Sequence, residues 1–174
     1  MKEKVKKIRD TVNNTIELLT SGLLEADAGY EVGTSSDADS TVTRIMLRDH
    51  CIISDVHSLL GGNDIAPCPA ELLLSALVAC IRASYVIHAS RMGVDLQSIE
   101  VKGAGVGDRR GTLGLDETVP AGFKELEYKV IIETEEPEEK IRELLQFVDC
   151  HCHVLNTLRR PLDIKGQVEI KSKA

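Results

Sequence analysis

The chain has 174 residues, 43% of them hydrophobic and 28% charged, a balance typical of one globular domain with an ordinary apolar core. A formal net charge of −7 argues against nucleic acid as the main partner, because binding to phosphates requires a basic surface. No run of about 18 apolar residues and no signal-peptide core is present, so we expect a cytoplasmic protein without a membrane span.

The first part of the chain reads as a helical arm. Apolar residues recur every three or four positions from residue 3 to residue 20, as in an amphipathic helix, and Gly22 follows as a stop. The stretch 26–40 is rich in Gly, Ser and Asp and is expected to form a loop or strand around Tyr30 to Val32. We therefore predict an arm at 1–25 and the main domain at 26–174.

The middle of the chain predicts a hairpin followed by a central helix. Apolar and polar residues alternate from 41 to 56 around a polar turn at 48–50, which is typical of a β-hairpin. Gly61 and Gly62 end this pattern. A helix is expected from Pro69 to Arg91, apolar on nearly every face, and such a helix is usually buried on most sides.

The last third returns to strands and then to helix. Strands are predicted at 94–106 and 125–133, with a turn or bulge at 108–111 between them. Helical spacing then runs from Glu138 to Leu158 in one or two helices, and a final strand is expected at 162–171. Hairpins mixed with helices, without strict alternation, indicate an α+β fold.

Five cysteines carry the chemical interest of the chain: Cys51, Cys68, Cys80, Cys150 and Cys152. An odd number in a chain without an export signal does not indicate a disulfide framework. Cytosolic cysteines are more often buried apolar residues, metal ligands or redox groups. Burial of Cys80 in an apolar helix would by itself make that thiol inert, so a reactive thiol here needs a stabiliser of its charged form.

Two motifs around these cysteines resemble those of the OsmC/Ohr superfamily. The first is the glycine pair at 61–62 followed by PAELLLSALVAC at 69–80, which is similar to the family pattern P-x-E-L-L-L-x-A-L-x-x-C. The second is CHVLNTL at 152–158, a cysteine followed by a short helix ending in Asn-x-Leu. The resemblance covers roughly residues 41–170 and implies an intertwined homodimer whose sheets wrap around central helices.

The resemblance also implies a reaction. Active members of the superfamily reduce organic hydroperoxides at the dimer interface, without a cofactor. A thiolate at the position of Cys80 attacks the peroxide and becomes a sulfenic acid, and a thiol at the position of Cys152 condenses with it into a disulfide. External thiols then reduce the disulfide. The implied partners are a second copy of the chain, an organic hydroperoxide and a thiol reductant.

In the active members an arginine from an early loop or strand stabilises the thiolate, and an acid near the start of the helix orients that arginine. By location Arg44 and Arg48 are candidates for the arginine, with Arg44 preferred, and Glu71 is the candidate acid. The Ohr subgroup has its acid directly after the proline, where this chain has Ala70. Glu71 lies about 100° further round the helix, and this pattern resembles the broader OsmC-like groups.

Two alternatives to a peroxidase stay open from the sequence. One is a catalytically weak OsmC-like dimer that binds a small apolar ligand or a partner. The other is a metal site at 150–153, where Cys150, His151, Cys152 and His153 provide thiolate and imidazole groups of the kind that bind zinc.

Overall fold

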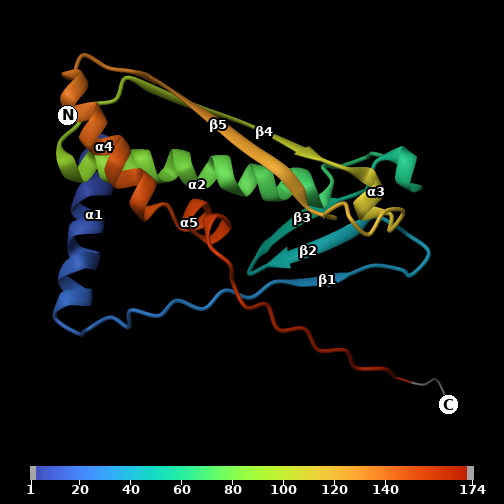
Figure 1. Cartoon of the computed structure of the whole chain (residues 1–174). Coiled ribbons are helices and arrows are strands. Elements are labelled where there is room, and N and C mark those ends of the chain that lie inside the picture. The colour runs from blue at the N-terminus through green and yellow to red at the C-terminus, as the bar shows by residue number, and fades with distance from the viewer. Residues whose placement is uncertain (1–2, 172–174) are drawn as a thin grey trace.

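The computed structural model describes residues 3–171 and contains helices and antiparallel strands, which confirms the predicted α+β class (Figure 1). In chain order the elements are α1 (Glu3–Thr20), β1 (Gly33–Ser35), β2 (Thr43–Leu47), β3 (His50–Ser54), the 3-10 turn η1 (Ser58–Leu60), α2 (Pro69–Met92), β4 (Ser98–Gly107), α3 (Arg109–Thr112), β5 (Phe123–Glu133), α4 (Glu138–His151) and α5 (His153–Arg159).

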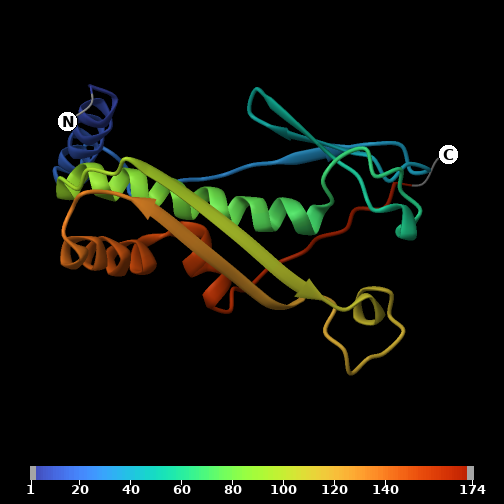
Figure 2. The ribbon, with the colours of Figure 1, turned by 90° about the horizontal axis from the view of Figure 1, so that it is seen from above.

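The strands form two separate antiparallel sheets, one ordered β1-β2-β3 and one made of β4 and β5. The predicted hairpin at 41–56 is the β2–β3 pair, and Arg48 in its turn has a positive φ of 52°. The predicted strands at 94–106 and 125–133 are β4 and β5, with a register irregularity between Val106 and Gly107. Figure 2 shows α4 and α5 on one side of α2 and the β1–β3 sheet on the other.

Helix α2 begins and ends where its sequence predicts. Pro69 occupies the first turn, where its missing N–H costs nothing, and Glu71 accepts a hydrogen bond from the backbone N–H of Cys68 at 2.7 Å. Gly93 ends the helix with a φ of 67°, a left-handed conformation that favours glycine. Helix α1 packs against α2. The predicted arm therefore contacts the main domain, and the division at residue 25 stays a prediction.

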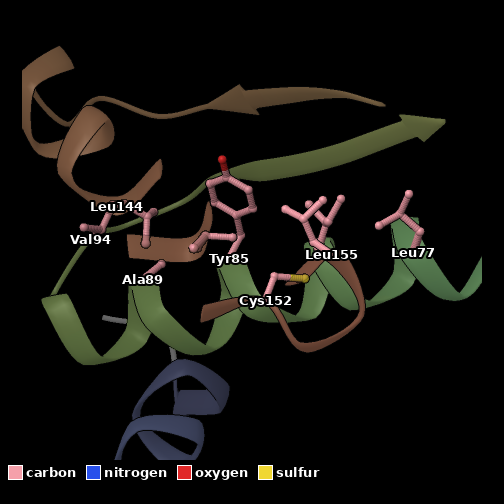
Figure 3. Close-up of a cluster of buried hydrophobic side chains, with 9 residues drawn as sticks. Leu77, Tyr85, Ala89, Val94, Leu144, Cys152 and Leu155 are labelled. Carbon is pink, nitrogen blue, oxygen red and sulfur yellow. The ribbon is translucent and has the colours of Figure 1, made fainter. Parts of the chain in front are cut away.

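The core lies along one stripe of α2, where it meets α4, α5 and the segment after α2 (Figure 3). Four residues of α2 spaced four apart face this core, as expected for one face of a helix. The core residues are Leu77, Ile81, Tyr85, Ala89, Val94, Leu144, Val148, Cys152 and Leu155. One of the two motif cysteines is thus a core residue.

Outside this stripe α2 is only partly covered, by α1 and β4, which corrects the expectation that this helix is buried on most sides. Its most apolar 18-residue window has a mean hydropathy of 1.8, yet only 28% of that window is buried within the chain. By length and composition alone α2 could cross a membrane, a property that it shares with the core helices of soluble proteins. A single chain therefore leaves a long apolar surface without a neighbour.

The predicted final strand at 162–171 is wrong for the single chain. No helix or strand is present in residues 161–171, and Figure 1 shows this segment extending away from the helices. Its apolar side chains Ile164, Val168 and Ile170 are 86%, 89% and 87% exposed. The alternation typical of a strand is real, but a strand forms only where a neighbour pairs its N–H and C=O groups. Of the loop or strand predicted around Tyr30 to Val32, residues 30–32 form a loop, and the strand β1 begins directly after it.

Candidate active site

The two motif cysteines meet, although 72 residues separate them in the sequence. The Sγ atoms of Cys80 and Cys152 are 3.5 Å apart, with the Cys152 thiol as the donor. Cys80 lies on α2 and is half-buried, whereas Cys152 lies between α4 and α5 and is 0% exposed. Figure 3 shows Cys152 in the segment that joins these two helices, beside α2.

A break between α4 and α5 places Cys152 there. The residue has an extended conformation, with φ −71° and ψ 117°. It is both the C-cap residue of α4 and the N-cap residue of α5. Its N–H donates to the carbonyl of Val148 at 2.9 Å, and its carbonyl accepts from the N–H of Asn156 at 3.0 Å. The helical direction therefore changes at this residue without losing either backbone hydrogen bond.

The Asn156 side chain holds this junction together. Its Nδ2 donates to the carbonyl of Asp149 at 3.0 Å and to the carbonyl of Cys152 at 2.9 Å, so that it joins the end of α4 to the start of α5. This explains why the second motif contains an asparagine four residues after the cysteine. The sequence contained the residue, but its role in shaping the site is visible only in the structure.

Because a helix starts at Cys152, the N–H groups of its first turn have no partner within the helix and are free to approach the sulfurs. The N–H of Val154 donates to Cys80 Sγ at 3.5 Å, and the N–H of Leu155 lowers the pKa of Cys152. These donors could not be predicted from the sequence, because nearly every residue has a backbone N–H and residue type does not show which of them is free. They offer hydrogen-bond stabilisation of sulfur charge from within the same chain.

Electrostatics distinguish the two thiols. Burial raises the pKa of Cys152 above its ordinary value, and the neighbouring Cys80 raises it further, while the Leu155 N–H and the Ser84 hydroxyl act in the opposite direction. Burial is the largest of these causes, so Cys152 keeps its proton at neutral pH and donates it to Cys80 in a hydrogen bond. Cys80 Sγ therefore accepts hydrogen bonds from both the Cys152 thiol and the Val154 N–H.

A small cavity of about 180 Å³ lies between α2, β5, α4 and α5, and neither motif cysteine lines it. Two tyrosines and Asp149 form its polar part: the Tyr128 hydroxyl donates to Asp149 Oδ1 at 3.3 Å, and Arg159 binds Asp149 Oδ2 at 2.8 Å. Burial raises the pKa of Tyr85 to about 12, which keeps this phenol protonated. The full lining consists of Ile81, Tyr85, Tyr128, Val130, Leu145, Val148, Asp149 and Leu155.

The predicted activating residues lie elsewhere in the single chain. Glu71 lies in the first turn of α2, about 13 Å along the helix axis from Cys80. Its carboxylate accepts a hydrogen bond from the Cys68 N–H, and this bond lowers the pKa of Glu71. Arg44 is an exposed residue of β2, opposite Ile53 of β3. Within residues 3–171 no hydrogen bond or ion pair joins Arg44 or Glu71 to either thiol. Their roles stay predictions.

The other cysteines and the histidines near 150–153 give the metal alternative no support. His151 stacks on Phe147 with ring centroids 4.1 Å apart, and its Nδ1 lies 2.7 Å from the Phe147 carbonyl. Cys51 and Cys150 are exposed. Among the residues that the structure describes, no group of three or more His, Cys, Asp or Glu side chains is placed to hold a metal ion.

Comparisons with known proteins found one family model and several similar solved structures. The family model for "OsmC-like protein" matches residues 61–166. Comparison with curated proteins gave no match. Among solved structures, an OsmC-like protein from Mycoplasma pneumoniae aligns with a TM-score of 0.65 at 22% identity, over 76% of this chain and 89% of that chain.

Two other solved structures have the same fold. An organic hydroperoxide resistance protein OsmC from Legionella pneumophila aligns with a TM-score of 0.55 at 17% identity, over 78% of this chain and 92% of its own. An OsmC-like protein of unknown function from Vibrio cholerae aligns with a TM-score of 0.60 at 11% identity, over 75% and 94%. The family model covers well over half of the chain and both motif cysteines, and the chain therefore belongs to the OsmC-like family.

Proposed function

We propose that this protein is a thiol-dependent peroxidase that reduces organic hydroperoxides through Cys80 and Cys152. The observation that carries the proposal is the 3.5 Å contact between the sulfurs of these two residues, which come from the two family motifs. Membership of the OsmC-like family, and structural similarity to a hydroperoxide resistance protein, support a role in peroxide resistance.

The proposed reaction has two steps in the protein. The Cys80 thiolate attacks the terminal oxygen of the hydroperoxide, the O–O bond breaks, and the alkoxide takes up a proton and leaves as an alcohol. Cys80 is thereby oxidised by two electrons to a sulfenic acid. The Cys152 sulfur then attacks Cys80 Sγ, the S–O bond breaks, and hydroxide leaves as water with the proton from Cys152. An external dithiol reduces the resulting disulfide.

Burial and hydrogen bonding assign the two roles. Cys80 is half-buried, whereas its partner is fully buried, and its sulfur accepts hydrogen bonds from the Cys152 thiol and the Val154 N–H. Cys152 is fully buried and keeps its proton, which suits a thiol that acts second. A sulfenic acid at Cys80 would form beside its resolving partner, where over-oxidation has little time to occur.

We also propose that the active form is a cytoplasmic homodimer. A partner chain would cover the exposed apolar faces of α2 and pair with the strand-like segment 162–171, neither of which has a neighbour within one chain. The same partner could bring Arg44 close to a thiol of the facing subunit, since Arg44 is exposed on β2. Arg44 and Glu71 are on this proposal activating residues of the dimer.

A second candidate function is the binding of a small apolar molecule by a catalytically weak dimer. The cavity of about 180 Å³ favours it, since mainly aliphatic side chains line the cavity and its size is close to that of cavities that accept a benzene ring. The two functions differ in one outcome: ligand binding leaves the thiols reduced, whereas peroxidase turnover oxidises them.

Peroxide consumption tests the proposal directly. The purified protein, cumene hydroperoxide and dithiothreitol are mixed, and the remaining peroxide is measured with time. We expect turnover by the native chain, loss of at least about a hundredfold in Cys80→Ser, since the nucleophile itself is removed, and native turnover in the exposed-cysteine control Cys51→Ser. Absence of peroxide loss with the native chain would overturn the proposal in favour of the binding function.

A further inference from the structure

Asp149 connects three elements of the structure through its side chain. It lies on α4, three residues before Cys152. Its Oδ1 accepts a hydrogen bond from the Tyr128 hydroxyl of β5 at 3.3 Å, and its Oδ2 forms an ion pair with Arg159 of α5 at 2.8 Å. Tyr128, Asp149 and Arg159, here called the Asp149 cluster, thus join β5, α4 and α5.

The backbone carbonyl of Asp149 accepts further hydrogen bonds from α5. Asn156 Nδ2 donates to this carbonyl at 3.0 Å, and Arg159 Nη1 donates to it at 3.5 Å. Arg159, the last residue of α5, therefore binds both the carboxylate and the carbonyl of one residue at the end of α4. Cys152 lies in the chain between the points that these contacts hold together.

The short helix α5 depends on such contacts. It has seven residues, and isolated helices shorter than about 12 residues are marginal in water. Apolar packing between β5 and the two helices is incomplete, because the cavity of about 180 Å³ lies between them. Tyr128 and Asp149 both line this cavity, and their hydrogen bond joins its β5 side to its α4 side.

We propose that Asp149 is a positioning residue for the resolving thiol, which it holds beside Cys80 through the Asp149 cluster. This inference rests on the proposed peroxidase function. The two sulfurs are 3.5 Å apart, and a disulfide bond brings them to about 2.05 Å, so a small movement closes the bond. Release of the α4–α5 junction from β5 lets Cys152 move away and lowers its effective concentration at Cys80.

The Asp149 cluster is expected to act on the second step of the reaction. Within residues 3–171 Asp149 makes no hydrogen bond to either sulfur, so its effect passes through the position of Cys152. The attack of Cys80 on the peroxide does not use Cys152 as a nucleophile. When Cys152 is displaced, the Cys80 sulfenic acid persists, and a second hydroperoxide oxidises it to sulfinic acid and is itself reduced to an alcohol.

Two measurements separate pairing of the thiols from peroxide chemistry. In the first, the protein is equilibrated with defined ratios of oxidised and reduced glutathione, alkylated, and analysed by mass spectrometry for the Cys80–Cys152 disulfide. This gives the midpoint potential of the pair without peroxide. In the second, the protein reacts with cumene hydroperoxide and is quenched at intervals, and the free Cys80 thiol, the sulfenic acid, the sulfinic acid and the disulfide are quantified.

The variants remove one ion pair from either side. Asp149→Asn removes the carboxylate charge at nearly constant size, Arg159→Gln removes the guanidinium, and the double variant combines the two changes. Arg142→Ala is the matched control, since it removes an exposed ion pair with Glu138 that lies wholly within α4 and joins no other element. Urea titration of each variant measures folding stability in parallel.

For Asp149→Asn we expect the disulfide to be about fivefold less favoured, which raises the midpoint potential by about 20 mV. Disulfide formation after peroxide slows about fivefold, loss of the Cys80 thiol stays within about twofold of the native rate, and sulfinic acid accumulates in excess peroxide. The double variant is no more affected than the worse single variant, since both changes remove the same ion pair. Arg142→Ala keeps the native potential and rates.

A native potential and a native rate of disulfide formation in Asp149→Asn would overturn the inference, even if folding stability falls. Additive effects of the Asp149 and Arg159 substitutions would also overturn it, because the two residues would then act separately. If the native chain forms the disulfide with glutathione but consumes no peroxide, the peroxidase function fails, and the potentials still decide the role of Asp149. If the native chain forms no Cys80–Cys152 disulfide at any glutathione ratio, there is no pair to position and the inference fails.

Discussion

At the scale of single residues, Cys152 shows how burial and hydrogen bonding set opposing demands. Its sulfur has no contact with solvent, and burial is the largest cause of its raised pKa. The Leu155 N–H and the Ser84 hydroxyl lower the pKa and only partly offset that effect. The protonated Cys152 thiol donates a hydrogen bond to Cys80 Sγ, so Cys152 is the donor and Cys80 the acceptor of the pair.

This raised pKa predicts the pH dependence of resolution. A thiol with a raised pKa loses its proton at higher pH. The rate at which the Cys80 sulfenic acid becomes a disulfide is therefore expected to keep rising with pH above about pH 8.5, the ordinary pKa of a thiol. Stopped-flow mixing of preformed sulfenic acid with buffers of increasing pH measures this rate. A rate that stops rising below that pH would contradict the assignment of Cys152 as the protonated thiol.

The sequence predicted the two thiols but not the groups that tune them. Cys80 and Cys152 stood in recognisable motifs, whereas the Val154 and Leu155 donors belong to the backbone and depend on where a helix restarts. Ser84 looked like one more small residue in an apolar helix. Glu71 and Arg44 were named from a pattern, and a single chain does not bring them to the thiols.

At the scale of elements, the break between α4 and α5 places Cys152 next to Cys80 and so forms the candidate site. Continuous helical spacing through 138–158 left open whether one helix or two would form, because periodicity does not show where a backbone changes direction. The two hydrogen bonds of Asn156 across the junction make the second arrangement stable. The α2 boundaries and both hairpins were predictable, since proline, glycine and alternation mark such features locally.

Asn156→Ala is expected to loosen this junction. Two part-buried hydrogen bonds are lost, and a net contribution of about 1 kcal/mol per bond predicts a loss of about 2 kcal/mol in the free energy of unfolding. Chemical denaturation followed by circular dichroism measures the loss, with Asn13→Ala on the exposed surface of α1 as the control. Native stability in Asn156→Ala would show that the break does not depend on this side chain.

The buried face of α4 offers a matched test of the core. Leu144 is fully buried and its neighbour Leu145 is 49% exposed. Leu144→Ala is expected to reduce the free energy of unfolding by about 2–5 kcal/mol, through lost burial and a cavity. Leu145→Ala is expected to cost much less, and comparable losses from the two substitutions in urea titrations would contradict the described orientation of α4.

At the scale of the whole molecule, the chain leaves apolar surface for a neighbour. The same alternation that predicted a strand at 162–171 is present as an extended, unpaired segment, and the apolar helix that was expected to be central is only partly covered. Local sequence patterns show which faces of an element are apolar, but they do not show whether the same chain or a second chain packs against those faces. This is why the fold class was predictable and the surroundings of α2 were not.

The proposed homodimer predicts a mass of twice 19.0 kDa in solution. Val168→Asp places a charge on the apolar face of the C-terminal segment and is expected to shift the mass toward that of a monomer, whereas the neighbouring charge change Glu169→Lys lies on the other face and is expected to keep the dimer. Light scattering after gel filtration measures both masses. A native chain that elutes as a monomer at micromolar concentration would contradict the proposal.

The redox pairing of Cys80 with Cys152 is tested most directly by peptide mapping after oxidation. The native chain is treated with one equivalent of cumene hydroperoxide, alkylated, digested without reduction and analysed by mass spectrometry. We predict one cross-linked peptide pair that joins Cys80 to Cys152, with Cys51 and Cys150 recovered as alkylated thiols. Recovery of Cys152 as a free alkylated thiol beside an unchanged or over-oxidised Cys80 would contradict the account.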